Sequence, residues 1–478
     1  MKFGHKINLK IESYDEKGRG VGEIEIVPGE IRPIVVPLSA KGDELEATFV
    51  KRDYGVKICK LDKIVKAGPD RVDAVCQHAG TCGGCLWQHL KYEAQLTEKE
   101  RGIRELFASL GLESALKSII PADETLGYRN RMDYCIGWNG EIGLKEYGSW
   151  NKYVDVRECL LLRGPSGPAD NAENNDVGRT LQIVREFMSE FDLQPWDAKF
   201  HTGDMRYVVI RDGQNTKQRM TILVVKDASR INDRARKYLI DKLESHCTSL
   251  LIGELTVPTD ISFAERFETL IGEPWLEENV NDITYRIHPN SFFQTNSAMA
   301  AKLQTVVLNE LFDIQRSGHS AQRTFDIRVL LDLYCGLGFF GIAAAKSDKD
   351  LKVWGYELDE EAIKLASQNA ELNKVVERCN FFSGKAEDLS WKDVQADAVI
   401  IDPPRSGLHP KVIKTLLNDT ERTLPSTIIY VSCNYHRLKD ELPAFLQNYE
   451  VTSIQPLDLF PQTPHVEVVV TLRLKTNP

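Results

Sequence analysis

Residues 329–341 read VLLDLYCGLGFFG, and this stretch decides the fold class of the chain. An apolar run of strand length leads into a loop with glycines at positions 336, 338 and 341. Glycine lets the backbone turn tightly and approach a ligand without interference from a Cβ atom. The stretch therefore predicts a strand, a ligand-binding loop and the start of a helix.

Strands and helices continue to alternate on the C-terminal side of this stretch. Helical segments separate the strand-like segments VWGYEL (353–358), NFFSG (380–384), DAVIIDPP (397–404) and IIYVSC (428–433). Such alternation indicates a doubly wound, mainly parallel sheet with helices on both faces. We expect this α/β, Rossmann-like domain to occupy residues 276–478.

Two carboxylates end strands of this domain. Glu357 ends the strand after the glycine loop, where a carboxylate can accept both hydroxyls of a ribose. The spacing Gly336-x-Gly338-x-x-Gly341 also fits a nicotinamide cofactor, so spacing alone leaves the cofactor open. Asp402 precedes two prolines, which would form a rigid wall beside a flat substrate at the ligand-binding edge of the sheet.

The N-terminal region has a different residue pattern. Residues 5–66 read as five short strands in which β-branched residues alternate with charges, which predicts a small five-stranded barrel over residues 1–66. Oligonucleotide-binding barrels have this size, as do many unrelated small barrels. Residues 1–66 carry 13 Lys and Arg against 11 Asp and Glu, which points only weakly to a nucleic acid.

Residues 67–275 are predicted to form a mixed central α+β domain. A helix is expected over residues 88–110, and strands are expected at MDYCIGW (132–138), DMRYVVIRD (204–212) and RMTILVV (219–225).

The composition of the chain of 478 residues excludes several classes of protein. The net charge is −10, no apolar run is long enough to span a bilayer, and the N-terminus lacks the features of a signal peptide. We therefore expect a cytoplasmic protein of two or three domains with no membrane role. In that compartment the ten cysteines are expected to be reduced, so clusters among them indicate metal or catalytic sites.

One such cluster has the spacing C-x5-C-x2-C, with a fourth cysteine in the strand-like segment VRECLLL. The four cysteines are Cys76, Cys82, Cys85 and Cys159. Four thiolates can hold zinc or an iron–sulfur cluster. A single C-x2-C hairpin favours the iron–sulfur cluster, and zinc bound with His78 and His89 is the minor alternative.

Together with three further motifs, these features resemble the RumA/TrmA family of RNA uracil-5-methyltransferases. The motifs are HPNSFFQTN (288–296), YVSCN (430–434) and PQTPHVEVV (461–469). The resemblance extends over nearly the whole chain, and its closest branch is the iron–sulfur-containing 23S rRNA enzymes. It implies a methyltransferase domain that binds S-adenosylmethionine, a TRAM-like or OB-like RNA-binding N-terminal barrel, and a [4Fe-4S] cluster on the four cysteines.

The resemblance also implies a set of cofactor-binding residues. They are Gln294, Tyr334, Gly336, Glu357 and Asp402. Two positions depart from the family pattern, because Phe339 and Lys385 stand where relatives often carry Asn or Asp.

Uracil carbon 5 is a poor nucleophile until another nucleophile adds at carbon 6. Cys433 follows a predicted strand at the edge where ligands bind, and it matches the nucleophile of the family. The family pattern assigns removal of the carbon 5 proton to Glu467, and His465, expected on the same strand face, is kept as a supporting group.

The expected reaction is methylation of a uridine in 23S rRNA, because the cysteine motif is similar to that of large-subunit rRNA modifiers. Three alternatives stay open. The first is a tRNA uracil-5-methyltransferase. The second is a cytosine-5-methyltransferase, which would share the cysteine. The third is a noncatalytic RNA-binding protein that keeps the fold.

Overall fold

The computed structural model of the chain divides into two compact units, each assembled from segments far apart in the sequence. The first comprises residues 1–105, 144–154 and 460–465, and the second comprises the rest. The structure describes residues 2–27, 29–53, 55–162, 176–312, 327–388, 390–418 and 423–475. None of the helices in these ranges combines the length and apolar character needed to cross a bilayer. The three-domain division stays a prediction.

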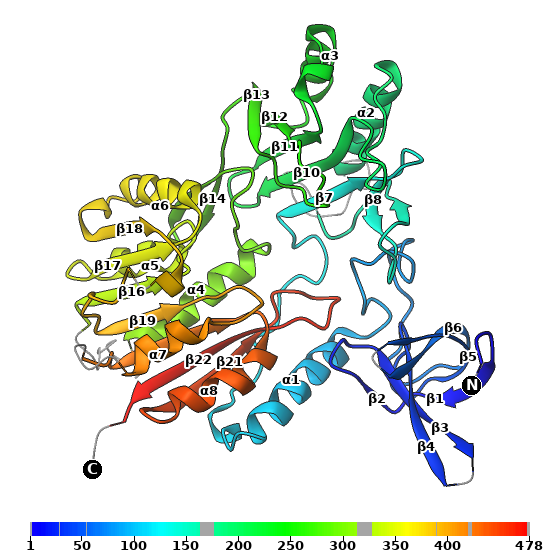
Figure 1. The fold of residues 1–478 in the computed structure, drawn as a ribbon, viewed down its shortest axis with the longest axis horizontal. Coiled ribbons are helices and arrows are strands. Elements are labelled where there is room, and N and C mark those ends of the chain that lie inside the picture. The colour runs from blue at the N-terminus through cyan, green and yellow to red at the C-terminus, as the bar shows by residue number, and fades with distance from the viewer. Residues whose placement is uncertain are drawn as a thin grey trace. The chain divides into compact units, whose positions relative to one another are not determined.

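The first unit contains a six-stranded sheet with the order β1-β5-β6-β4-β3-β2 (Figure 1). Its strands are β1 (Lys6–Lys10), β2 (Ser13–Tyr14), β3 (Gly20–Val27), β4 (Glu30–Val36), β5 (Glu44–Asp53) and β6 (Val56–Lys66). We predicted five strands. The first predicted strand is divided into β1 and β2, because the chain changes its pairing partner between them. Ile11 donates its backbone N–H to Asp43 (2.9 Å), whereas Glu12 donates to Val21 (2.8 Å).

This partner change curves the sheet. Strands β1 and β2 follow one another in the chain yet stand at opposite edges of the sheet, so the sheet bends back on itself. Its core consists of the buried residues Leu9, Ile11, Ile34, Val36, Leu45, Ala47, Phe49 and Cys59. Helix α1 (Tyr92–Ala108) follows, and it starts later than predicted because Leu90 still belongs to a turn closed by the Trp87 carbonyl.

A second sheet, most of which belongs to the second unit, has the order β13-β12-β11-β10-β7-β8-β9. Its strands are β7 (Arg131–Ile136), β8 (Ile142–Lys145), β9 (Tyr153–Asp155), β10 (Met205–Gly213), β11 (Gln218–Val225), β12 (Ser249–Glu254) and β13 (Arg266–Ile271), and its helices are α2 (Asp176–Glu190) and α3 (Asp233–Leu243). Strands β7, β10 and β11 confirm the three predicted ones. The expected strand around Cys159 is wrong, because residues 156–162 form a loop, and most of its apolar side chains are buried.

The third sheet has the order β18-β17-β16-β19-β20-β22-β21. Its strands are β16 (Val329–Leu333), β17 (Lys352–Glu357), β18 (Cys379–Ser383), β19 (Ala398–Ile401), β20 (Thr427–Ser432), β21 (Tyr449–Leu457) and β22 (Glu467–Leu474). A hairpin of β14 (Leu276–Val280) and β15 (Ile283–Ile287) precedes it. The accompanying helices are α4 (Ser297–Phe312), α5 (Phe339–Ser347), α6 (Glu360–Leu372), α7 (Pro410–Asn418) and α8 (Leu438–Phe445). The predicted α/β sheet is confirmed, with α4 to α6 on one face and α7 and α8 on the other (Figure 1).

The strand order of this sheet determines where a ligand can bind. Strand β17 lies on one side of β16 and β19 lies on the other, so the order reverses at β16. Ligands of such sheets bind beyond the carboxyl ends of the strands at this switch point. Strand β22 runs antiparallel to both of its neighbours, β20 and β21, which places its first residue at the same edge.

Candidate active site

The loop after β16 leaves room for a ligand. Tyr334, Gly336 and Gly338 adopt left-handed φ values of 65°, 53° and 80°. A Cβ added to Gly336 would meet no atom within 4 Å, so the backbone borders open space there. A Cβ added to Gly341 would lie 2.8 Å from the side chain of Val353. Gly336 therefore borders space that a ligand can enter, whereas Gly341 lets α5 pack closely on β17.

Glu357 is the last residue of β17, as its sequence position predicted. Its carboxylate accepts the backbone N–H groups of Gly336 (3.2 Å), Leu358 (2.7 Å) and Asp359 (3.1 Å). These hydrogen bonds orient the carboxylate beside the glycine loop. Each of its oxygens has two lone pairs, so capacity remains for the hydroxyls of a ligand.

The segment that follows β15 supplies Gln294, whose side chain is buried. Its backbone carbonyl accepts the Asn130 side-chain amide at 2.8 Å. The two departures from the family pattern behave differently. Phe339 is buried and meets Phe293 edge-on with ring centroids 5.7 Å apart, whereas Lys385 is exposed after β18. Phe339 thus packs within an aromatic cluster.

Cys433 and Glu467 lie opposite one another at the edge of the sheet. The antiparallel ladder of β20 and β22 pairs Ser432 with Val468, so the next opposed positions are Cys433 and Glu467. The neighbouring strand β19 ends immediately before Asp402. The structure thus brings together three residues that are far apart in the sequence.

Burial and mutual repulsion favour the protonated forms of these acidic groups. Burial, with repulsion from Glu357, raises the pKa of Asp402 to about 7. Burial and then repulsion from Asp402 hold the pKa of Glu467 well above its usual range. Burial and the two nearby carboxylates raise the pKa of Cys433 to about 11. A cationic ligand at this edge would favour the ionised forms of all three groups.

Arg405 is the positive charge that opposes this trend. Its guanidinium lowers the pKa of both Cys433 and Glu467. Its backbone carbonyl accepts the Asn434 side-chain amide at 3.0 Å, which ties the loop after β19 to the loop after β20. The sequence identified Arg405 only as the residue after Asp-Pro-Pro, because its proximity to Cys433 arises when two loops meet.

Glu441, on α8, is a second residue that the sequence did not single out. One carboxylate oxygen accepts the Tyr430 hydroxyl at 2.6 Å, and the other accepts the Leu408 backbone N–H at 2.9 Å. Tyr430 lies on the strand that leads to Cys433, and Leu408 lies in the loop that starts at Asp402 and precedes α7. A Cβ at Gly407 would lie 2.1 Å from this carboxylate, so glycine is required there. No sequence motif marks Glu441.

Comparison with known proteins identifies the family. The sequence model described as tRNA (Uracil-5-)-methyltransferase matches residues 268–475. The tRNA (uracil(54)-C(5))-methyltransferase of Pyrococcus horikoshii is 36% identical over 93% of this chain and 96% of its own length. The chain belongs to the family of RNA uracil-5-methyltransferases.

Two further relatives extend the likeness over the whole chain. An uncharacterized RNA methyltransferase of Nanoarchaeum equitans is 35% identical over 98% of this chain and 93% of its own length. The crystal structure of the Pyrococcus abyssi tRNA (uracil-54, C5)-methyltransferase in complex with S-adenosyl-L-homocysteine matches with a TM-score of 0.75 and 31% identity, covering 97% of this chain and 99% of that one. The family activity is S-adenosylmethionine-dependent methylation of uracil carbon 5 in RNA.

The glycine loop of this methyltransferase fits S-adenosylmethionine. The open space at Gly336 and the oriented Glu357 carboxylate suit the ribose part of the cofactor. The acidic edge formed by Asp402 and Glu467 suits a positively charged sulfonium.

One predicted residue of the site is placed differently. We expected His465 on the same strand face as Glu467, but β22 begins at Glu467. His465 precedes the strand and is exposed, whereas Glu467 is 3% exposed. The strand geometry on which a supporting role for His465 depended is therefore wrong.

The predicted metal-binding cysteines are divided between the two compact units. Cys76, Cys82 and Cys85 belong to the first unit, and Cys159 belongs to the second. Within the described part of the chain, no three His, Cys, Asp or Glu side chains are arranged to hold a metal ion. No step of the reaction is therefore derived through a metal.

Proposed function

We propose that this methyltransferase acts on tRNA and methylates carbon 5 of uridine 54, with Cys433 as the nucleophile and Glu467 as the base. The observation that carries the chemistry is the opposed placement of Cys433 and Glu467 on β20 and β22, beside Asp402. A thiol and a buried carboxylate on one ligand-binding edge are the groups that this reaction requires.

The proposed reaction uses each group once. The Cys433 thiolate forms a bond to carbon 6 of uracil, and the electron pair of the 5,6 double bond moves toward carbon 5. S-adenosylmethionine, when bound, would supply the methyl group that carbon 5 takes up, and its sulfur would keep the electron pair of the broken bond as S-adenosylhomocysteine. Glu467 then removes the proton from carbon 5, the double bond reforms, and the bond from carbon 6 to sulfur breaks to return the thiolate.

The remaining site residues are proposed to hold the cofactor. Glu357 would accept the ribose hydroxyls, while Tyr334 and Gly336 would line the cofactor along the glycine loop. Gln294 and Asp402 would complete its surroundings. The side chain of Arg405 would stabilise the thiolate of Cys433, since it already lowers the pKa of that thiol.

The choice of tRNA has support from the relatives of stated function. The enzymes of Pyrococcus horikoshii, Pyrococcus furiosus and Pyrococcus abyssi, each named a tRNA (uracil(54)-C(5))-methyltransferase, are 34% to 36% identical to this chain. The cysteine motif predicted a 23S rRNA target instead. It remains the second candidate because the cysteines of that motif are present.

Methyl transfer from labelled S-adenosylmethionine tests the target. The substrates are an unmodified tRNA transcript, the same transcript with cytidine at position 54, and a 23S rRNA transcript. We expect label only in the first, in 5-methyluridine. Label in the 23S transcript alone would overturn the tRNA assignment, and 5-methylcytidine as the product would establish the cytosine-5 alternative.

Two substitutions test the residue roles. Cys433→Ala should abolish both methyl transfer and the covalent adduct with an RNA that contains 5-fluorouracil. Glu467→Gln should still form the bond to carbon 6 and take up the methyl group, but it should accumulate the methylated adduct because the proton stays on carbon 5. Full turnover by Cys433→Ala would contradict the covalent route, and a wild-type protein inactive on every RNA would favour a noncatalytic RNA-binding role.

We also propose roles for the rest of the chain. Residues 1–66 would form a TRAM-like RNA-binding domain, residues 67–275 a central domain, and residues 276–478 the methyltransferase domain. The [4Fe-4S] cluster on the four cysteines is retained as a proposal. Its support is the cysteine motif itself, in which the N–H groups of His78 and Gly84 donate to the sulfur atoms of Cys76 and Cys82, each at 3.4 Å.

A further inference from the structure

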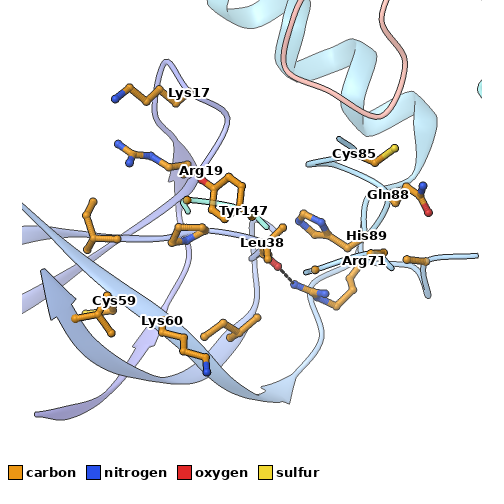
Figure 2. Close-up of a pocket in the computed structure, with 18 of the residues that line it drawn as sticks. Lys17, Arg19, Leu38, Cys59, Lys60, Arg71, Cys85, Gln88, His89 and Tyr147 are labelled. Carbon is orange, nitrogen blue, oxygen red and sulfur yellow. Dashed lines mark hydrogen bonds between the residues drawn. The ribbon is translucent and has the colours of Figure 1, made fainter. Parts of the chain in front are cut away.

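A pocket of about 840 Å³ lies in the first compact unit (Figure 2). Residues of strands β5 and β6 form one wall of the pocket. Residues of the segments 71–74, 79–89 and 147–148 also line the pocket. None of the proposed catalytic or cofactor residues lines it. Ligand pockets of a few hundred to about 1,000 Å³ hold molecules of the size of a nucleotide.

Cations dominate the charged side chains of the pocket. Five lining residues are basic, namely Lys17, Arg19, Lys51, Lys60 and Arg71, and only Asp73 is acidic.

The two arginines are already paired. Arg19 contacts Asp15 at 2.7 Å and Arg71 contacts Asp43 at 2.7 Å. Lys51 and Lys60, which are exposed on the adjacent strands β5 and β6, have no ion-pair partner among the residues that the structure describes. Their charge is available to an anion.

Beside these lysines the pocket presents flat and neutral groups. Burial, together with the charge of Arg71, lowers the pKa of His89 to about 4, so the imidazole is neutral. Its Nε2 lies 3.3 Å from the Ser39 carbonyl, which only accepts, so Nε2 carries the proton and Nδ1 remains an acceptor. Burial raises the pKa of Tyr147, so the phenol also stays neutral. Aromatic rings and neutral acceptors suit a nucleobase.

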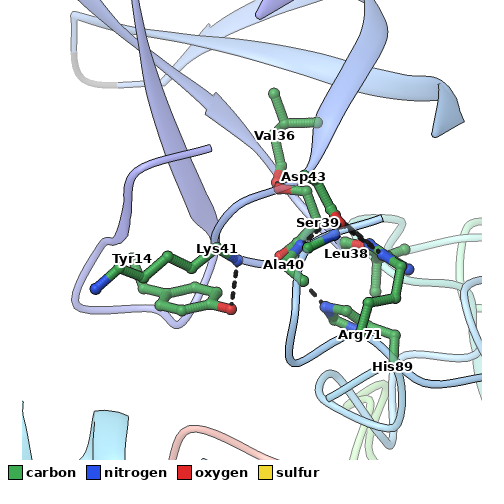
Figure 3. Close-up of polar contacts among 10 residues, drawn as sticks. Tyr14, Val36, Leu38, Ser39, Ala40, Lys41, Asp43, Arg71 and His89 are labelled. Atoms are coloured by element: carbon green, nitrogen blue, oxygen red, sulfur yellow. Dashed lines mark hydrogen bonds and ion pairs between the residues drawn. The ribbon is translucent and has the colours of Figure 1, made fainter. Parts of the chain in front are cut away.

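The wall that carries His89 is held in place before any ligand binds (Figure 3). Arg71 donates to the carbonyl of Leu38 at 3.0 Å and forms a two-pronged contact with the buried Asp43. Leu38 has a left-handed φ of 65°, which these bonds help to maintain. A wall that is ordered in advance lowers the entropy lost on binding.

We infer that this pocket binds one unstacked nucleotide of the substrate RNA, separately from the uracil that is methylated. The base lies against the Tyr147 ring and the His89 acceptor, and Lys51 and Lys60 contact the adjoining phosphates. This inference rests on the proposed function for RNA as the substrate. It assigns the pocket a role in RNA affinity and none in the chemical step.

Binding of unmodified tRNA to the full chain, followed by fluorescence anisotropy at several salt concentrations, tests the inference. Replacing both lysines (Lys51→Gln with Lys60→Gln) should weaken binding and reduce the slope of log K against log salt by about 1.4, as for two lost single-strand phosphate contacts. The matched control replaces Lys10 and Lys63, which are exposed on β1 and β6 outside the pocket. Equal losses of RNA affinity in both double variants would overturn the assignment of this pocket to RNA binding.

Tyr147 supplies the second arm of the test. Tyr147→Ala should raise the Kd for tRNA about fivefold or more, because stacking of a base on an aromatic ring is lost, while Tyr147→Phe should bind as the wild type does. The rate of methyl transfer at saturating RNA should be unchanged in both. Wild-type affinity of Tyr147→Ala would refute the stacked base.

Two outcomes distinguish this inference from the proposed function and from the proposed cluster. If the wild type binds tRNA through these residues but transfers no methyl group, the proposed function fails and the pocket assignment stands. Cys85 also lines the pocket, so the iron content of each variant is measured. Loss of iron together with RNA affinity in the lysine variant would overturn the inference and assign the pocket to the cluster.

Discussion

At the scale of single residues, the chemistry of the site depends on the number of negative charges that the ligand-binding edge of the sheet can hold. Cys433, Glu467 and Asp402 all have raised pKa values because they are desolvated close to one another. The positive charge of Arg405 lowers the pKa of two of them, Cys433 and Glu467. The ionisation of the nucleophile is therefore set jointly by several side chains, and single substitutions should shift it measurably.

Replacing Arg405 with Met should make Cys433 harder to ionise. The change removes the positive charge that lowers the pKa of the thiol, so that pKa should rise from about 11. Since the thiolate is the reactive form, alkylation of Cys433 by iodoacetamide at pH 9 should slow by about threefold or more. Mass spectrometry of the peptide that contains Cys433 measures the rate. Arg405→Lys, which keeps the charge, is the control, and equal rates for wild type and Arg405→Met would contradict the prediction.

Asp332, in β16, should make the protein less stable as the pH rises. Burial, with repulsion from Asp402 and Glu357, raises the pKa of Asp332 to about 8, whereas an unfolded Asp ionises near 4. Between these values the native state binds more protons than the unfolded state, so the free energy of unfolding falls with increasing pH. Asp332→Asn removes this ionisation and can still accept the Gly341 N–H, which now lies at 2.9 Å.

Thermal unfolding at pH 5 and pH 8 measures this effect. The Tm of the wild type should fall more between the two values than the Tm of Asp332→Asn. The variant should retain some pH dependence, because Asp402 also titrates in this window. An identical fall in both proteins would show that Asp332 is ionised in the native state.

At the scale of elements, Glu441 joins strand β20, which leads to Cys433, to the loop that starts at Asp402. From α8 it bonds Tyr430 on β20 and the backbone of Leu408 after β19. A buried acceptor with two donors cannot be removed without leaving those donors unpaired, at a cost of about 1–3 kcal/mol each. The positions of Cys433 and Asp402 relative to each other therefore depend on a residue that would not touch the substrate.

Glu441→Ala should slow formation of the 5-fluorouracil adduct by about tenfold or more, while the affinity for S-adenosylmethionine changes little. The physical reason is that the loop after β19 is released relative to Cys433, whereas the glycine loop after β16 keeps its own contacts. Tyr430→Phe removes one of the two bonds and should have a smaller effect. Loss of adduct formation and of cofactor affinity in equal measure would indicate general destabilisation of the fold.

At the scale of the whole molecule, the proposed cluster would add a bound group to the native state. Anaerobically purified protein should then contain about four iron atoms and four sulfides per chain. Removal of the cluster by a chelator and an oxidant should lower the Tm, because a bound group stabilises the native state. Cys82→Ser should contain little iron. A colourless protein with full methyl transfer and no iron would remove the cluster from the proposal.

The sequence by itself determined the order of strands and helices in the methyltransferase sheet. The alternation of apolar strands and amphipathic helices is a local pattern, and so is the run of glycines after β16. Local patterns can be detected in a single sequence because each residue is constrained mainly by its near neighbours in the chain. The positions of Glu357, Asp402 and Cys433 at strand ends were predictable for the same reason.

Only the tertiary structure decided which of these residues meet. Glu467 lies opposite Cys433 because β22 inserts antiparallel between β20 and β21, and no local pattern encodes that register. The roles of Arg405 and Glu441 and the partner change at Ile11 also depend on contacts between distant segments. Such contacts are fixed by the packing of side chains and by the pairing of strands in space, which hydrophobic periodicity does not specify.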